Sequence, residues 1–155
     1  MSGARYSLTG QVAVALPPDE AFALFTPRGE EEWAQGWRPR FPVPVDDDSA
    51  PGTVFETDSH GERTIWVVVD RQEASRIAYA RVTPGARAGS VTVRVADDGR
   101  GGTTAQVTYE LTALSPHGER ELRDFAADYP AFLGEWQEEI AALLRSRPPN
   151  AATPS

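Results

Sequence analysis

The sequence contains no cysteine and no lysine. Without cysteine there is no disulfide framework, no thiol nucleophile and no thiolate metal site. Because all 15 basic residues are arginine, a Schiff-base lysine and a phosphate-loop lysine are excluded as well. Long apolar runs are also missing, since the longest, Ile65–Val69, is far shorter than the ~20 residues of a membrane-spanning helix. We therefore expect no membrane insertion.

Positive charge is scarce relative to negative charge. The 15 arginines stand against 23 acidic residues, which gives a net charge of −8. A nucleic-acid groove needs a concentrated basic face, so we expect no nucleic-acid partner. The first residues, Met1–Tyr6, lack the apolar segment of a secretory signal. We expect a cytoplasmic protein that needs no cofactor and is a monomer or a homodimer.

Alternation of apolar and polar residues predicts six strands. Residues 6–16 place Leu8, Val12 and Val14 on one face. Five further segments show a strand pattern: 53–57, 64–70, 76–82, 89–96 and 103–113. The last two alternate most regularly, which is typical of an antiparallel sheet with one covered face. In residues 64–70 the side chains of both faces are largely apolar, so the pattern does not show which face of this strand points inward.

Two short helical segments follow the first strand. Pro17–Glu20 opens a helix, because proline suits the first helical position and acids favour the positive end of the helix dipole. Thr26–Pro27 is expected to end it. Glu30–Gln35 is expected to form a second short turn with Trp33 as its anchor.

A long helix closes the pattern. It begins at Ser115, a good N-cap residue, and carries one continuous apolar stripe. Pro130 interrupts the stripe, which predicts either a kink near Tyr129 or two shorter helices. Residues 146–155 are expected to form a disordered tail.

The order of these elements predicts an α+β fold. A six-stranded sheet must cover its apolar face, and only the long helix has enough apolar surface to do so. We expect one domain over residues 1–145, in which a curved six-stranded antiparallel sheet wraps around a long C-terminal helix, with two short helices after the first strand. The space between sheet and helix would be an apolar pocket with a few placed polar groups.

This arrangement resembles the SRPBCC superfamily, also called START-like or Bet v-like, whose members have a helix-grip fold. The residues that carry the resemblance are Leu16–Phe25, Trp33, Arg76–Arg81, Thr104–Thr112 and, in the last helix, Phe132, Trp136 and Ile140. The sequence is most similar to the small bacterial polyketide-cyclase-like and heat-shock-activator-like branches. The resemblance implies a cavity for a hydrophobic small molecule, and some members of these branches are cyclases or aromatases.

Arg81 is the most informative candidate for a ligand contact. It shares strand parity with Ile77 and Tyr79, so it points into the cavity if they do. A guanidinium there would hold a ligand carboxylate or enolate through two hydrogen bonds. Alternatively, Arg81 reaches solvent at the end of the sheet, or pairs with Glu56 or Asp58.

Aromatic residues supply the other candidates. The ones expected to flank a ligand are Tyr79, Tyr109, Tyr129, Trp66 and Trp136. A tyrosine hydroxyl there would donate to a ligand carbonyl, whereas the alternative is that these rings pack in the core with their hydroxyls satisfied locally. Trp33 and Trp37 stand in a segment that is either a lid over the cavity or a plug at its end.

No metal site is expected. His60 is placed in a hairpin turn and His117 in the first turn of the last helix, and neither has a carboxylate at the spacing of a zinc motif. The acidic runs Glu30–Glu32 and Asp46–Asp48 lack the pattern of a calcium loop. We expect both runs on solvated faces.

Three functions fit this sequence. The first is binding of a hydrophobic or aromatic small molecule that Arg81 orients. The second is a cyclase or aromatase, which needs an acid–base group such as a tyrosine, His60 or Glu56 beside the arginine. The third is a protein-interaction module of the chaperone-activator type. Whether any reaction is catalysed stays open, because the fold alone does not choose among these functions.

Overall fold

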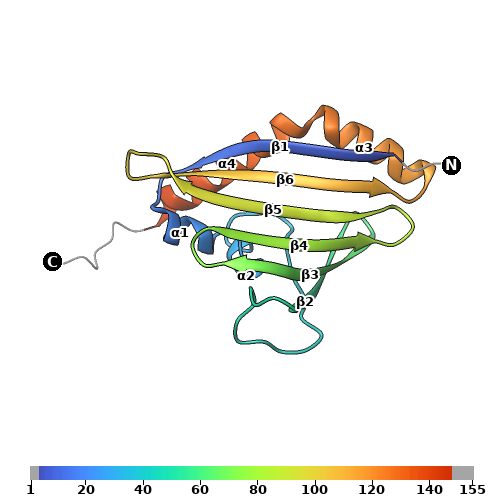
Figure 1. The fold of residues 1–155 in the computed structure, drawn as a ribbon, viewed down its shortest axis with the longest axis horizontal. Coiled ribbons are helices and arrows are strands. Elements are labelled where there is room, and N and C mark those ends of the chain that lie inside the picture. The colour runs from blue at the N-terminus through green and yellow to red at the C-terminus, as the bar shows by residue number, and fades with distance from the viewer. Residues whose placement is uncertain (1–3, 148–155) are drawn as a thin grey trace.

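The computed structural model describes residues 4–147. Its strands form one antiparallel sheet in the order β1-β6-β5-β4-β3-β2 (Figure 1). The strands are β1 (Arg5–Val14), β2 (Val54–Ser59), β3 (Glu62–Gln72), β4 (Arg76–Thr83), β5 (Arg87–Asp97) and β6 (Thr103–Ala113). The α+β class and the strand segments expected from alternation are confirmed, with ends within two residues of the expected ones.

The helices form two pairs. They are α1 (Pro18–Ala23), α2 (Pro27–Glu30), α3 (Pro116–Ala127) and α4 (Tyr129–Ser146). In Figure 1, α3 and α4 run behind the β1 and β6 side of the sheet, and α1 and α2 lie near the end where β1 finishes. This leaves β2, β3 and β4 without a helix of the long pair directly against them.

The expectation that Thr26–Pro27 only ends a helix is incomplete. Pro27 stands at the start of α2, and Thr26 is its N-cap, with its hydroxyl accepting a 3.1 Å hydrogen bond from the backbone N–H of Gly29. Proline is tolerated there because the first N–H groups of a helix have no partner within it. The same dipeptide therefore ends α1 and begins α2.

Of the two alternatives at Pro130, the structure has two helices. The chain leaves helical geometry at Asp128, and Pro130 then lies in the first turn of α4. Ser115 caps α3, because its Oγ accepts a 3.0 Å hydrogen bond from the N–H of Gly118. α4 ends at Ser146, and residues 148–155 of the expected tail lie outside the described residues.

The inward face of β3 is the one that carries Trp66. Thr64, Trp66 and Val68 are buried, and a register shift follows between Val68 and Asp70. The irregularity lies in β3, so the alternation of β4 is uninterrupted from Ile77 onward. Trp66 pairs with Arg81 across the two strands, which puts both side chains on the same face of the sheet.

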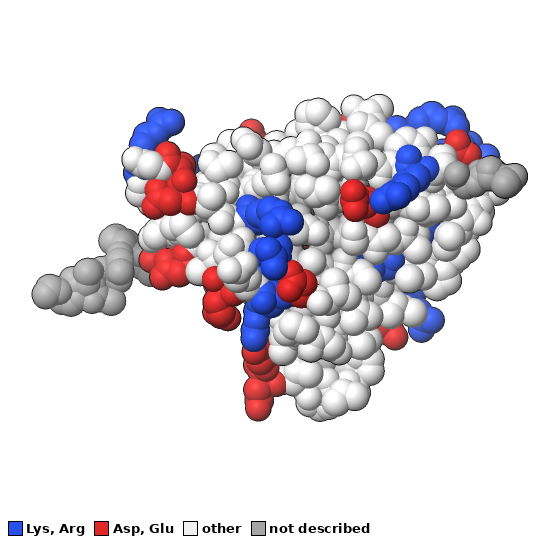
Figure 2. Space-filling model, in the orientation of Figure 1, with Lys and Arg blue, Asp and Glu red and all other residues white. Residues whose placement is uncertain are grey.

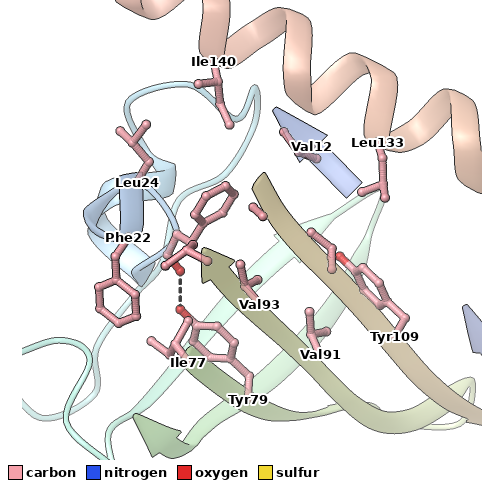
Figure 3. Close-up of a cluster of buried hydrophobic side chains, with 14 of the residues drawn as sticks. Val12, Phe22, Leu24, Ile77, Tyr79, Val91, Val93, Tyr109, Leu133 and Ile140 are labelled. Atoms are coloured by element: carbon pink, nitrogen blue, oxygen red, sulfur yellow. Dashed lines mark hydrogen bonds between the residues drawn. The ribbon is translucent and has the colours of Figure 1, made fainter. Parts of the chain in front are cut away.

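The core joins this face to α4 and to α1. Figure 3 shows side chains of the sheet pointing toward Leu133 and Ile140 of α4, toward Phe22 of α1 and toward Leu24, which follows α1. The approach is tightest at Gly10 of β1, where a Cβ would lie 2.5 Å from Leu133 Cδ1. α4 therefore seats against one edge of the sheet and diverges from the other edge.

The outer face of the sheet carries scattered charges of both signs. Figure 2 shows a short column of basic groups near the middle of this side, with acidic groups beside it. Within residues 4–147, no helix is both long enough and apolar enough to cross a membrane.

Candidate functional site

A cavity of about 820 Å³ lies between the sheet and α4. Its walls come from the inward faces of β3 to β6, from one side of α4, and from residues 34–37 after α2. Residues 57–60 at the end of β2 border it as well. Small-molecule sites usually span about 300–1,000 Å³, so this volume suits a molecule of several fused rings.

Arg81 lies in this cavity rather than in solvent. Its guanidinium carbon is 4.6 Å from the centre of the Trp66 ring, in cation–π geometry. One terminal nitrogen, Nη2, donates a long 3.4 Å hydrogen bond to Thr83 Oγ1. The Nε atom is buried and has no hydrogen-bond partner among residues 4–147. One face of the guanidinium thus packs on Trp66, and most of its N–H groups make no hydrogen bond to the described residues.

The electrostatics of Arg81 follow from this burial. The pKa of Arg81 is lowered to about 10, chiefly by desolvation and also by the nearby charge of Arg87, while Tyr109 and Glu62 act in the opposite direction. The group remains protonated at neutral pH. A positive charge with few compensating partners therefore faces the cavity.

The carboxylates suggested as alternative partners of Arg81 are occupied elsewhere. Arg40 donates to Asp58 at 2.5 Å and to Glu56 at 3.2 Å, and Arg63 lies 3.8 Å from Glu56. Glu56 is not among the residues that line the cavity. It therefore does not serve as the acid–base group beside Arg81 that an enzyme would need.

The three candidate tyrosines differ in what their hydroxyl groups do. Tyr79 donates to the backbone oxygen of Phe25 at 2.7 Å, beside the core cluster of Figure 3. Tyr129 donates to the backbone oxygen of Val107, also at 2.7 Å. Tyr109 makes no side-chain hydrogen bond within the described part of the chain, and it lines the cavity. Only the Tyr109 hydroxyl is left for a ligand.

Tyr109 and Arg81 are electrostatic neighbours. Burial raises the pKa of Tyr109, while the positive charge of Arg81 lowers it. Tyr109 therefore stays protonated as a hydrogen-bond donor near the guanidinium. The two groups form a pair of donors on the sheet wall, one from β4 and one from β6.

Five of the six predicted site residues line the cavity: Arg81, Tyr79, Tyr109, Trp66 and Trp136. Tyr129, also expected beside the ligand, instead packs between Tyr109 and Phe125, and it does not border the cavity. The reason is the close approach of α4 to β1 at Gly10, where Tyr129 lies against the strand.

Trp33 and Trp37 take the two roles that the sequence left open. Trp33 is buried, donates from Nε1 to the Leu24 carbonyl at 2.8 Å, and packs on Trp136, so it plugs the end of the core. Trp37 lines the cavity, donates to the Pro27 carbonyl at 2.8 Å, and contacts Trp66 edge-on. Of these two residues, only Trp37 lines the cavity.

Glu30 is a cavity residue that the sequence reasoning missed. The run Glu30–Glu32 was expected on a solvated face, yet Glu30 is buried while Glu31 and Glu32 are exposed. Burial raises the pKa of the Glu30 carboxyl well above 4.5. The signal was the helix start at Thr26, which places Glu30 one turn later, beside Trp33.

Polar residues from β3, β5 and α3 meet in the wall of the cavity. Arg87 contacts Glu121 at 2.7 Å and Glu62 at 3.2 Å, and His117 lies 3.3 Å from Glu121. The expectation that no histidine has a carboxylate at ligand spacing is therefore wrong, because Glu121 follows His117 by one helical turn and the sheet adds Glu62. Arg87 already neutralises both carboxylates, so this arrangement is an ion-pair network.

His60 lies at the tip of the β2-β3 hairpin, as expected. It has a left-handed backbone with φ of 52°, is followed by Gly61, and is exposed. The tip borders the cavity, so the hairpin does reach its rim.

Several solved structures share this fold. An uncharacterised protein from Rhizobium leguminosarum is 17% identical, with a TM-score of 0.66 over 94% of this chain and 98% of that one. CalU16 from Micromonospora echinospora is 15% identical, with a TM-score of 0.64 over 96% and 85%. A truncated norcoclaurine synthase from Thalictrum flavum is 12% identical, with a TM-score of 0.66 over 96% and 98%. At these identities the similarity establishes the fold alone.

Sequence comparison gives the family. No curated protein matches the chain. The family model described as polyketide cyclase / dehydrase and lipid transport matches residues 5–141, a span that contains all six strands and the lining of the cavity. This match confirms the resemblance to the SRPBCC superfamily and its helix-grip fold. The chain therefore belongs to the polyketide cyclase / dehydrase and lipid transport family.

Proposed function

We propose that this protein binds a hydrophobic, aromatic small molecule that carries an anionic or carbonyl oxygen. The observation that carries this proposal is the Arg81 guanidinium, a charge that lines the cavity, makes one long 3.4 Å hydrogen bond to Thr83 and has no ion pair within residues 4–147. A buried polar group without a partner costs about 1–3 kcal/mol, so a ligand oxygen that accepts from the free N–H groups of this guanidinium recovers free energy on binding. Arg81 is the group that orients the ligand.

The surroundings of Arg81 define the shape of this ligand. The guanidinium rests with one face on the Trp66 indole, so its N–H edge is left for a planar oxygen group. Trp37 and Trp136 line the same cavity and offer ring surfaces for offset or edge-to-face contacts. A flat, fused-ring molecule with one oxygen group at its end matches both features.

Two fluorescent probes test the aromatic and the anionic parts of this proposal separately. 8-Anilinonaphthalene-1-sulfonate and N-phenyl-1-naphthylamine share one ring system, but only the first carries a sulfonate. We expect one molecule of either probe to bind per chain, with the sulfonate probe bound more tightly. Arg81→Met should weaken the binding of the sulfonate probe by about 10- to 100-fold, which is what a charged hydrogen bond contributes to affinity. It should leave the affinity for the neutral probe unchanged.

A matched control separates this effect from a general loss of charge. Arg94 lies on the exposed face of β5, so Arg94→Met changes the net charge equally without touching the cavity. It should leave both affinities unchanged. Failure of the wild-type protein to bind either probe would refute the proposal, as would an equal loss of both probes in Arg81→Met.

A further inference from the structure

Glu30 contributes a carboxyl group to the cavity without an evident structural task. Only 9% of the residue is exposed, and no side-chain hydrogen bond or ion pair joins its carboxyl to another group within residues 4–147. Acidic side chains are rarely buried to this extent unless they are paired. The unpaired group lines the same cavity as Arg81.

The position of Glu30 is set by tight packing of α2 on α1. A Cβ at Gly29 would lie 1.8 Å from the carbonyl oxygen of Ala23, so only glycine permits this approach. The Thr26 cap then directs the short helix so that Glu30 faces inward, while Glu31 faces solvent. The carboxyl is therefore held on rigid backbone rather than on a flexible loop.

Glu30 lies within electrostatic reach of the sheet wall but does not neutralise Arg81. Its negative charge contributes to raising the pKa of both Tyr79 and Tyr109. No ion pair joins it to Arg81 within residues 4–147, and it is not among the charges that act on the pKa of Arg81. Glu30, Arg81 and Tyr109 all line one cavity, so a molecule whose oxygen is held by Arg81 and Tyr109 shares that cavity with the carboxyl.

We propose that the cavity catalyses proton transfer at the carbon next to the carbonyl group of a bound aromatic ketone, with Glu30 as the group that moves the proton. This activity rests on the proposed function, because the ketone oxygen is the ligand oxygen that Arg81 holds. It adds a reaction to what would otherwise be binding alone.

The reaction is an isomerisation that balances without a further reactant. The Glu30 carboxylate removes a proton from the α-carbon, and the electron pair of that C–H bond forms the new C=C bond. The π electrons of the carbonyl move onto its oxygen, which becomes an enolate held by hydrogen bonds from Arg81 and Tyr109. The Glu30 carboxylic acid then returns the proton to carbon, which restores the ketone, or to oxygen, which gives the enol.

The protonation behaviour of Glu30 is consistent with this role. Because burial raises its pKa, its carboxylate is a stronger base than that of an exposed glutamate. The charge of Glu30 acts on Tyr79 and Tyr109 of the sheet, and Asp48, before β2, acts on Tyr79 as well. Glu135 and Glu139 of α4 line the same cavity as Glu30. Burial and the charge of Glu135 raise the pKa of Glu139 as well, so Glu139→Gln is needed to assign a pH profile to Glu30.

Hydrogen–deuterium exchange of 2-tetralone tests the inference. This bicyclic aromatic ketone exchanges the protons next to its carbonyl with D₂O, and proton NMR follows the loss of their signal. Displacement of N-phenyl-1-naphthylamine measures its binding independently. We expect the wild-type protein to accelerate exchange over buffer, and Glu30→Gln to lose about 100-fold or more of the protein-dependent rate while it still binds 2-tetralone.

Variants and pH separate catalysis from binding. Glu31→Gln, at the exposed neighbour, should keep the wild-type rate. The wild-type rate should rise with pH through an inflection above that of an ordinary glutamate, and this inflection should persist in Glu139→Gln. If 2-tetralone binds without accelerated exchange, or if Glu30→Gln retains the rate, the catalytic inference is wrong and the binding function stands. If neither naphthalene probe binds, the binding function fails and the inference fails with it.

Discussion

Replacing Arg81 with methionine should stabilise the ligand-free protein even though it removes the proposed ligand contact. Burial lowers the pKa of Arg81 from 12.5 to about 10, and each pKa unit corresponds to about 1.4 kcal/mol. Keeping this guanidinium charged inside the cavity therefore costs about 3 kcal/mol. Methionine has a similar length and fills the same space without a charge.

The net gain is smaller than this cost. The substitution also removes the cation–π contact with Trp66, which is worth about 0.5–2 kcal/mol. We expect the free energy of unfolding to rise by about 1–2 kcal/mol, which is about 2–8 °C in Tm for a domain of this size. The gain should not vary between neutral pH and about pH 9, because Arg81 is protonated in both the folded and the unfolded state there. Above about pH 10 the gain should shrink, since the folded wild-type protein then loses this proton before the unfolded chain does.

Urea unfolding followed by circular dichroism measures this difference. The protein should first be unfolded and refolded, so that no hydrophobic molecule carried over from expression occupies the cavity. Arg94→Met is the control and should change the free energy of unfolding by less than about 0.5 kcal/mol. If Arg81→Met lowers the free energy of unfolding by more than about 1 kcal/mol while the control does not, the guanidinium stabilises the fold, and the reasoning that reserves it for a ligand is refuted.

Four further substitutions give distinct results. Glu30→Gln should flatten the pH dependence of stability. The folded wild-type protein keeps the proton of the Glu30 carboxyl at pH values where the unfolded chain has lost it, so the free energy of unfolding falls as pH rises from about 4.5 through the raised pKa. Urea titrations from pH 4 to 8 should show a smaller fall in the variant. Gly118→Ala should lower the free energy of unfolding by about 1–3 kcal/mol, because its Cβ would lie 1.8 Å from a backbone carbonyl oxygen. Gly134→Ala, which has open space around it in α4, should raise the free energy of unfolding by about 0.4–1 kcal/mol. Thermal unfolding of the two variants checks these opposite signs. Arg87→Met should cost about 1 kcal/mol because it leaves two partly exposed carboxylates facing each other, and added salt should reduce that cost in the same assay.

Local pattern was enough to place most of the fold. A strand alternates with period two, so the inward direction of Arg81 followed from its spacing to Ile77 and Tyr79 once their burial was known. Proline chemistry predicted a break in the last helix but not its form. Whether Pro130 bends a helix or starts a new one depends on the two or three residues before it, and the structure resolves this at Asp128.

The candidate site was less predictable because its parts are distant in sequence. Glu30 looked like one member of a solvated acidic run, and the one local signal of its inward direction is the helix start at Thr26, which the sequence pattern suggested only as a helix end. Tyr129 lies on the apolar stripe of the helix like other candidates, yet its hydroxyl donates to the Val107 carbonyl and the residue does not line the cavity. Both outcomes depend on how one helix seats against another element.

What the sequence by itself determined is the set of local preferences: the alternating strands, the capped helices, the aromatic face, and the absence of cysteine and lysine that excludes whole classes of chemistry. Only the tertiary structure decided which polar groups share the cavity. It leaves the Nε of Arg81 without an acceptor among the described residues, turns Glu30 inward from another element, and pairs Arg87 with the acidic residues beside it. The physical reason is that side-chain direction repeats over a few residues, whereas desolvation and charge pairing depend on every element that closes around a group, wherever it stands in the chain.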